Sequence, residues 1–400
     1  MLIRMVKLFA LLLVFSVAAP PDSNGQKFRR NPEKIIQKED RNGDNKLSRR
    51  EFRGNPSRFD DIDKDGDGYL TAAEFKVFFA ARRGGRGGGR GDRGAGDGKA
   101  WSSPVKMAGY SGRIINTHAQ YDQTIETDEI VAILKRATVS KVIISGRARR
   151  FNEDILAAAE KYPGLIFASA RTKFRFYLEG HEKWGDYLGD VARNPKFIGM
   201  QELLLYHAEK ISPRGRKLAP EMIVGTDSRQ MQDAVSVSLD RKWPVVLHYE
   251  FAVLSADRKK RLMSDLETLL RKHPGHAFTL MHMGLLRIGE VKRLIASHKN
   301  IYFHLSMAAN VYRETGFPWT FMFKESGAVG ELRADWKDIL AAHADRFLFA
   351  MDGVFSNQWR RRSVRDIQEW RAALATMPKQ AADLIAHKNA ERLWPGLIRQ

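Results

Sequence analysis

A histidine and a glutamine stand two residues apart in the stretch Asn116–Gln120, directly after a short apolar run. Two imidazoles at the positions of His118 and Gln120, at the end of a strand, could bind one metal ion, but here the second side chain is an amide. A neutral amide oxygen is a poor, hard ligand for zinc beside nitrogen donors, so it lowers the affinity or changes the preferred metal. The stretch leaves two interpretations open: a metal site with a replaced ligand, or a site that holds no metal.

Other polar side chains close or follow later apolar runs, where they could join His118 at one site. A single histidine at a strand end is more often a satisfied core residue than a ligand. Several of them converging at one place favour a functional site. The candidates are Arg147, Arg171, Glu202, His248, Glu250, His282 and Asp352, with His304 as a weaker one.

The elements that must position these residues repeat the pattern of apolar strand, polar loop and amphipathic helix from about residue 108 onward. The predicted strands are 113–116, 141–145, 165–170, 197–205, 244–249, 277–282, 301–305 and 347–352. The predicted helices include 127–137, 153–161, 227–241, 257–273, 288–297 and 334–343. Eight such units predict an α/β fold, a (β/α)₈ TIM barrel over residues 108–398, whose active site lies at the carboxyl ends of the strands. The alternative is a doubly wound open sheet, but no glycine-rich phosphate fingerprint follows the first strand.

The order and spacing of these motifs resemble the amidohydrolase superfamily. The resemblance is to the branch related to aminocarboxymuconate-semialdehyde decarboxylase and 2-pyrone-4,6-dicarboxylate lactonase. It covers nearly all of the large domain. The stretches that carry it are Thr117-His118-Ala119-Gln120, Val246-Leu247-His248, Met281-His282-Met283-Gly284, Asp345–Asp352 and the closing segment Asn389–Leu393.

The resemblance implies a divalent metal, most often zinc, that activates water or polarises a carboxylated substrate. It makes His118 and His248 imidazole ligands and Asp352 a carboxylate ligand that accepts the proton of water. Gln120 takes the place of the second imidazole. His282 would polarise the scissile carbonyl or act as a general acid. Glu202 would be a further ligand or orient a histidine, unless it forms an ion pair with Arg171 or Arg147.

Two features of the sequence bear on the substrate. Arg147 and Arg171 are candidates for binding a substrate anion, because a guanidinium suits carboxylate or phosphate; the alternative is simple solvent exposure. The aromatic-rich loop from Asn310 to Gly330 is either a lid or substrate wall, or it packs over the barrel rim.

Three functions remain open at this stage. The first is a metal-dependent hydrolase acting on a C–N, C–O or ester-like bond of a small, anionic substrate. The second is a metal-dependent non-oxidative decarboxylase on the same scaffold. The third is a non-catalytic exported binding protein with a degenerate metal site. The first is our prediction, so the protein is expected to be an enzyme with a small-molecule substrate.

Two twelve-residue loops within residues 30–81 have the ligand spacing of the EF-hand calcium site. We expect them to form a small all-α EF-hand pair ahead of the barrel. Asn45 takes the place of the usual glycine in the first loop. Leu47 and Leu70 stand at the apolar eighth position, through which paired loops contact each other. The alternative is a degenerate loop that binds weakly. The candidate Ca²⁺ ligands are Asp40, Asn42, Asp44, Lys46, Ser48, Glu51, Asp63, Asp65, Asp67, Tyr69, Thr71 and Glu74.

The N-terminal residues 1–19 read as a signal peptide, with basic residues, a short apolar core and small residues for cleavage; the alternative is an uncleaved anchor. A periplasmic or secreted protein without a later membrane span is therefore expected. The chain has 0 cysteines, which excludes disulfides and thiolate ligands. Residues 82–100 form an Arg/Gly-rich linker, and the net charge is +20. Such tracts can bind RNA, but no aromatic residue interleaves here, so no nucleic-acid partner is expected. A surface or protein partner for the EF-hand module is expected instead.

Overall fold

The computed structural model describes residues 31–48, 51–53, 59–62, 69–83, 109–211 and 217–398. The chain divides into two compact units, Met1–Ala95 and Gly96–Gln400. The predicted signal peptide, most of the linker, and Asp63, Asp65 and Asp67 of the second calcium loop lie outside the described residues. Within the described part of the chain, no helix is both long and apolar enough to cross a membrane.

The N-terminal unit is a small helical module with one short ladder. Its elements are α1 (Pro32–Glu39), β1 (Leu47–Ser48), α2 (Phe59–Ile62), β2 (Tyr69–Leu70) and α3 (Ala72–Arg83). Strands β1 and β2 are antiparallel, and Leu47 lies opposite Leu70, as the loop spacing predicts. Ile36, Phe59 and Phe75 are buried beside them and form the core of the module.

The large unit is built on eight successive parallel strand segments, and it confirms the predicted TIM barrel. They are β3 (Ile115–Tyr121), β4 (Lys141–Gly146), β5 (Ile166–Ala170), β6 (Phe197–Met200) continued by β7 (Leu203–Leu204), β12 (Val245–His248), β13 (Phe278–Leu280), β14 (Ile301–His304) and β15 (Phe347–Leu348). They form two arcs, β3-β4-β5-β6 and β7-β12-β13-β14-β15. Backbone bonds between β3 and the segment after β15 close the ring: Thr117 N donates to Phe349 O at 3.1 Å and Asp352 N to His118 O at 3.0 Å.

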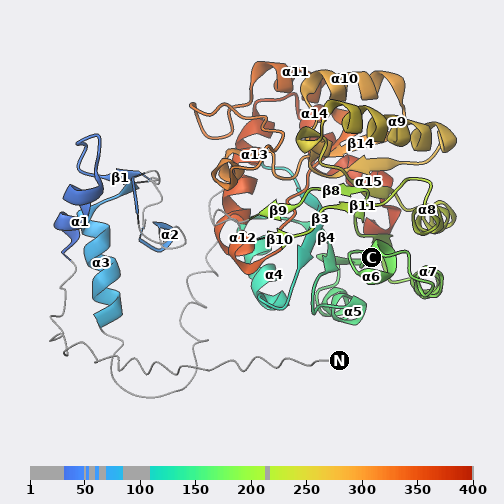
Figure 1. The fold of residues 1–400 in the computed structure, drawn as a ribbon, viewed down its shortest axis with the longest axis horizontal. Helices are drawn as coiled ribbons and strands as arrows, with labels where there is room; N and C mark the ends of the chain where they lie inside the picture. The colour runs from blue at the N-terminus through green and yellow to red at the C-terminus, as the bar shows by residue number, and fades with distance from the viewer. Residues whose placement is uncertain are drawn as a thin grey trace, which may run out of the picture. The chain divides into compact units, whose positions relative to one another are not determined.

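Amphipathic helices cover the outside of the strands, as Figure 1 shows. Each buries one apolar stripe against the sheet, as Ile130, Ile133 and Leu134 do in α4. The longer ones are α4 (Thr127–Arg136), α5 (Asn152–Lys161), α7 (Trp184–Arg193), α8 (Arg229–Arg241), α9 (Ala256–Lys272), α10 (Ile288–Ser297), α11 (Ala334–Ala342) and α13 (Ser363–Ala375). The shorter ones are α6 (Arg175–Leu178), α12 (Ser356–Arg361), α14 (Lys379–Asp383) and α15 (Asn389–Leu393).

The barrel interior changes from apolar to polar along the strands. One apolar side chain from each strand or its end forms a buried cluster with Trp394 and Leu397; the eight are Ile115, Ile143, Phe167, Ile198, Val246, Met281, Tyr302 and Leu348. Residues two further along face the same side. On four strands the next two such positions are polar: Ser145 and Arg147, Ser169 and Arg171, His248 and Glu250, His304 and Ser306. The carboxyl ends of the strands therefore form a polar mouth over an apolar floor.

The structure corrects several predicted boundaries. Strand 1 runs from Ile115 to Tyr121 instead of ending at Asn116, so His118 and Gln120 lie inside it. Strand 4 is interrupted at Gln201 and Glu202, and strand 6 ends at Leu280, before His282. An excursion after strand 4, absent from the prediction, pairs β8 (Tyr206–His207) with β11 (Met222–Ile223) and β9 (Lys210–Ile211) with β10 (Lys217–Ala219).

Candidate metal centre

Three predicted ligands and the substituted glutamine meet at the mouth of the barrel. His118 Nε2 lies 3.3 Å from Asp352 Oδ1 and 3.6 Å from Glu202 Oε1. Gln120 Nε2 donates to both carboxylates at 2.9 Å and lies 3.4 Å from His118 Nε2. Strand 1 and the segments at the ends of strands 4 and 8, which are distant in sequence, thus bring four side chains around one point. All four are buried.

The distances from His118 Nε2 to the other three side chains are those between two ligands of a tetrahedral metal ion, whereas Gln120 Nε2 lies closer, at 2.9 Å, to each carboxylate. Ligands at zinc distances of about 2.0–2.2 Å stand about 3.3–3.6 Å apart in a tetrahedron, which matches the distances from His118. Gln120 Oε1 is buried and has no hydrogen-bond partner among the described residues. Turning the amide by half a revolution would bring this oxygen to the position of Nε2, beside both carboxylates. The residues present therefore fit a divalent ion with Gln120 as a fourth, oxygen donor.

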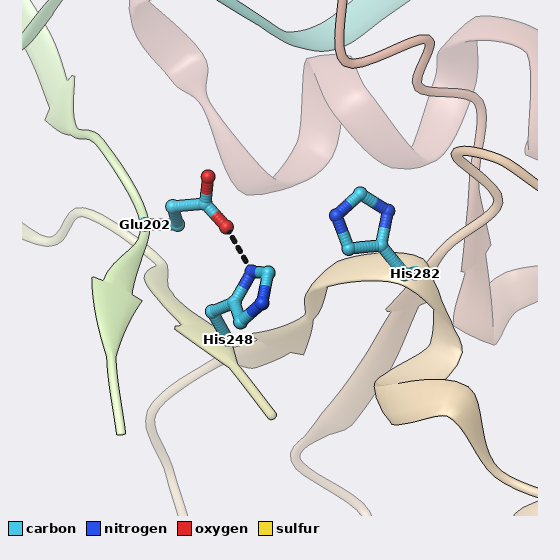
Figure 2. A group of neighbouring side chains, drawn as sticks. All are labelled: Glu202, His248 and His282. Carbon is cyan, nitrogen blue, oxygen red and sulfur yellow. Dashed lines mark hydrogen bonds and ion pairs between the residues drawn. The ribbon is translucent and has the colours of Figure 1, made fainter. Parts of the chain in front are cut away.

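His248 lies next to this group but faces a different set of atoms. Its Nδ1 is 2.5 Å from Glu202 Oε2, as Figure 2 shows, and its Nε2 is 3.3 Å from Glu250 Oε1. Burial lowers the pKa of His248, but the two carboxylates outweigh it and raise the pKa to about 9. Donor atoms of His248 also group with Glu202 and His282, and with His207 and Glu250. The predicted ligand His248 is thus separate from the group of His118, Gln120, Glu202 and Asp352. It is placed to orient Glu202, or to bind a metal ion on the other side of that carboxylate.

His282 lies beside Asp352 and His248, in the turn that follows strand 6. Figure 2 shows its ring facing His248, and its Nε2 lies 3.4 Å from Asp352 Oδ2. Its Nδ1 is 2.9 Å from Ser306 Oγ, which fixes the ring. Burial lowers the pKa of His282 to about 4, so the imidazole is neutral at pH 7. A neutral ring can polarise a carbonyl, whereas a protonated general acid is disfavoured there.

His282 and Asp352 both have left-handed backbone conformations, with φ of 51° and 52°. Such conformations are costly for residues other than glycine and concentrate at functional sites. The backbone bond from Asp352 N to His118 O holds the second of them in place. The structure therefore maintains strained backbone at the two residues predicted to be catalytic.

Two lysines complete the charge balance, and neither was predicted. Lys173 Nζ forms an ion pair with Glu202 Oε1, and Lys210 Nζ pairs with Glu250 at 2.7 Å. Burial raises the pKa of Glu202, but Lys173 and His248 outweigh it and hold the pKa well below its usual value. The alternative ion pair of Glu202 with Arg147 or Arg171 is wrong, because Lys173 takes that place. Gln201 Nε2, at 3.0 Å from His118 Nε2, is a further missed contact.

The two arginines lie on the rim without an acidic partner. Arg147 stacks on Phe355 and Arg171 on Phe151, and neither guanidinium has an ion pair with any residue the structure describes. Arg171 is half-buried, and its Nε has no hydrogen-bond partner in the described chain. Burial, with a smaller effect of Arg147, lowers the pKa of Arg171. Arg171 Nη1 donates to Arg150 O at 3.4 Å, and no carboxylate among the described residues pairs with either guanidinium, so both retain donors for an anion.

The aromatic loop after strand 7 reaches the centre. The Trp319 ring lies 4.9 Å from the His282 ring, and Phe317 lies under the Lys210 ammonium at 3.7 Å. The loop thus forms one wall of the mouth. His304, the weaker candidate, is fully buried below, with its ring 6.0 Å from that of His118 and 6.2 Å from that of Trp394. Burial lowers its pKa well below the usual value, so it packs as a neutral ring.

The first calcium loop has the turn geometry that the spacing predicts. Asp40 accepts the amides of Asn42, Gly43 and Asn45 at 3.2, 2.8 and 2.9 Å. Asn45 has a φ of 60°, the left-handed conformation expected of the residue that replaces glycine. Glu51 Oε2 accepts Ser48 N at 3.0 Å, and Glu74 Oε2 accepts Thr71 N at 2.9 Å, so the two loops end alike.

Each of the two units contains a match to a known family model. The amidohydrolase family model matches residues 126–396, and an EF-hand model matches residues 57–79. No match was found among proteins of curated function.

Similar solved structures include 2,6-dihydroxybenzoate decarboxylase, with 16% identity and a TM-score of 0.47 over 70% of this chain and 98% of that one. They also include an uncharacterised TIM-barrel protein from Bordetella bronchiseptica, with 14% identity and a TM-score of 0.48 over 72% of this chain and 100% of that one. A zinc-bound amidohydrolase from Burkholderia multivorans has 13% identity and a TM-score of 0.41 over 71% and 99%. The family assignment rests on the match to residues 126–396, which spans more than half of the chain. The chain therefore belongs to the amidohydrolase family of enzymes.

Proposed function

We propose that the barrel is a metal-dependent hydrolase that cleaves a C–N, C–O or ester-like bond in a small anionic molecule. The observation that carries the proposal is the spacing of His118 Nε2, Asp352 Oδ1, Glu202 Oε1 and the Gln120 amide around one point. Zinc is the expected ion, with the amide oxygen of Gln120 favouring a harder ion or weaker binding than an imidazole would.

The bound ion would lower the pKa of a water molecule and polarise the bond to be cleaved. His118, Glu202, Asp352 and Gln120 would hold it, and His248 would orient Glu202 through Nδ1. Asp352 is ionised, since His118 lowers its pKa against the effect of burial, so it can accept the proton of the attacking water. The neutral His282, fixed by Ser306, is placed to donate a hydrogen bond to the carbonyl oxygen.

Arg147 and Arg171 supply the anion specificity in this proposal. Both follow their strands on the rim of the mouth and lack acidic partners among the described residues. A guanidinium fork binds carboxylate or phosphate through two parallel hydrogen bonds. The rings of Phe355 and Phe151, and Trp319 across the mouth, would contact the rest of the substrate.

The N-terminal features complete the proposal. We infer that the protein is exported through residues 1–19 and that its EF-hand loops bind Ca²⁺ at the high concentrations found outside the cytosol. The similar ends of the two loops, at Ser48–Glu51 and Thr71–Glu74, support calcium binding by both. A surface or protein partner for this module is part of the same proposal.

The test is metal analysis followed by a product assay. Protein purified without chelators should contain about one equivalent of a divalent metal per barrel, measured by elemental analysis. A panel of small amides, lactones and esters bearing a carboxylate should then give hydrolysis products without release of CO₂. Release of CO₂ from a carboxylated substrate would instead identify a decarboxylase.

A further inference from the structure

The Lys173 ammonium binds the same oxygen that a metal ion would use. Lys173 Nζ is paired with Glu202 Oε1. That oxygen also accepts the Gln120 amide at 2.9 Å and lies 3.6 Å from His118 Nε2. The Lys173 side chain is only 14% exposed and that of Glu202 is 0% exposed, so the pair is shielded from solvent. A cation supplied by the chain itself therefore lies on a candidate ligand atom.

The remaining acids of the mouth are also matched by groups of the chain. Glu250 is paired with Lys210 and accepts Ala208 N at 2.7 Å. Asp352 accepts the Gln120 amide at 2.9 Å, and its two oxygens lie 3.3 Å from His118 and 3.4 Å from His282. The centre thus satisfies its carboxylates with its own donors, and adding a divalent ion next to Lys173 would bring two cations onto one oxygen.

We propose that Lys173 competes with the metal ion for Glu202, so that the ion binds as the ammonium leaves this carboxylate. The inference rests on the proposed metal centre and adds a loading step to it. Repulsion between the ammonium and a divalent ion is strong in a buried site, where charges are poorly screened. The ion pair therefore sets the metal affinity of the centre.

Lys210 provides a matched control. It is also a lysine paired with a buried glutamate in the same mouth, with a side chain 25% exposed. Its partner Glu250 lies outside the His118, Glu202 and Asp352 group. Replacing Lys210 removes the same charge from the mouth and frees Glu250, which groups with His207 and His248, but it frees no atom of the His118, Glu202 and Asp352 group. It therefore separates competition at Glu202 from a general change of charge.

The experiment is a zinc titration of the full-length protein, after chelation and dialysis, for the wild type and the variants Lys173→Met and Lys210→Met. Isothermal calorimetry gives the Kd of each, and circular dichroism reports folding. Direct competition at a buried ligand predicts a Kd at least about tenfold lower for Lys173→Met, with Lys210→Met within about threefold of wild type. Equal gains in both variants, or no gain in Lys173→Met, would overturn the proposal while leaving the metal centre intact. If none of the three proteins binds zinc, the metal centre and the competition are both wrong.

A second measurement needs no variant. Reductive methylation modifies a free ε-amine much faster than a buried, ion-paired one, and mass spectrometry locates the modified lysine. Zinc should increase methylation of Lys173 severalfold while leaving Lys210 unchanged. Zinc that binds in calorimetry without changing the methylation of Lys173 would contradict its displacement.

Discussion

Asp352 and His118 are joined twice, once through their backbones and once through their side chains. Asp352 N donates to His118 O at 3.0 Å, and His118 Nε2 lies 3.3 Å from Asp352 Oδ1. The bond that closes the barrel between its last and first strands therefore also sets the spacing of two proposed metal ligands.

Asp352→Asn should abolish activity. The amide cannot accept the proton of water and is a weaker ligand, so kcat should fall at least about 1,000-fold, the scale seen when one member of a catalytic unit is removed. The backbone bond to His118 survives the change, so the melting temperature should stay close to wild type. Measurable turnover at the wild-type rate would rule out Asp352 as the base.

Gln120→His should strengthen zinc binding. An imidazole nitrogen is a better zinc donor than an amide oxygen, and the side chain already lies between Glu202 and Asp352. We expect a Kd lower by about one to two powers of ten, the range over which neighbouring groups tune metal sites. Gln201→His, at the adjacent amide that contacts His118, is the control and should give a smaller gain. A histidine at position 120 that leaves the affinity unchanged would argue against an ion at this point.

Arg171→Met should weaken substrate binding. Losing a charge-assisted hydrogen bond of about 1.5–3 kcal/mol should raise KM about 10- to 100-fold for anionic substrates. Neutral analogues should be affected much less. Arg149→Gln, an exposed arginine two residues after Arg147, is the control with unchanged kinetics. Equal KM changes for charged and neutral substrates would remove the anion role.

Stability should fall as pH rises because of Asp366. Burial, and to a smaller extent the charge of Glu369, raise the pKa of Asp366 well above its usual value, although Tyr312 donates to it at 2.9 Å. The folded protein thus keeps a proton that the unfolded chain releases near pH 4. The contribution of this carboxyl is greatest below the unfolded pKa and declines by up to about 1.4 kcal/mol per pH unit until the folded pKa.

In Asp366→Asn the free energy of unfolding should no longer show this decline. The difference between its values at pH 4 and pH 7, measured by urea denaturation, should therefore be smaller than in the wild type. Asp338→Asn, an exposed position on α11, should leave the pH dependence unchanged. A slope that is the same for all three proteins would show that Asp366 is ionised in the folded state.

Glu51→Gln should weaken calcium binding at the first EF-hand loop. The change removes one charged ligand and should raise the Kd by about tenfold or more. Glu74→Gln should do the same in the second loop, and the double variant should lose binding in a calcium titration. If the double variant still binds two calcium ions, these loops are not the calcium sites.

Much of the fold is readable from the sequence because the strands are buried and regular. Ile288–Ser297 is identical to the predicted helix, and the strand predictions err mainly at their ends. The errors fall where backbone bonds depend on distant segments. Strand 1 extends to Tyr121 because its second half pairs with β4 and Gln120 N also donates to Gly353 O, after β15. Strand 6 stops early because His282 adopts a left-handed conformation.

The predicted site residues stand in or directly after apolar runs, a pattern visible in the sequence, but Lys173 and Lys210 were missed. Their partners, Glu202 and Glu250, lie 29 and 40 residues away, so no local pattern links them. A signal for Lys173 did exist: it is the next position in the series Phe167, Ser169, Arg171 on the inward face of strand 3. Lys210 had none, because it stands on the excursion that the sequence pattern did not predict.

The backbone hydrogen bonds of Thr117 and Asp352 join the first and last strands of the barrel. The protection of these amides should therefore report whether a metal ion occupies the centre. A metal ion held by His118, Gln120 and Asp352 would link the first strand to the segment after the last strand, because its ligands come from both. Deuterium uptake at the amides of Thr117, Gln120 and Asp352 should then slow as the ion is added. Deuterium uptake at this junction would thereby measure metal occupancy of the site without a known substrate.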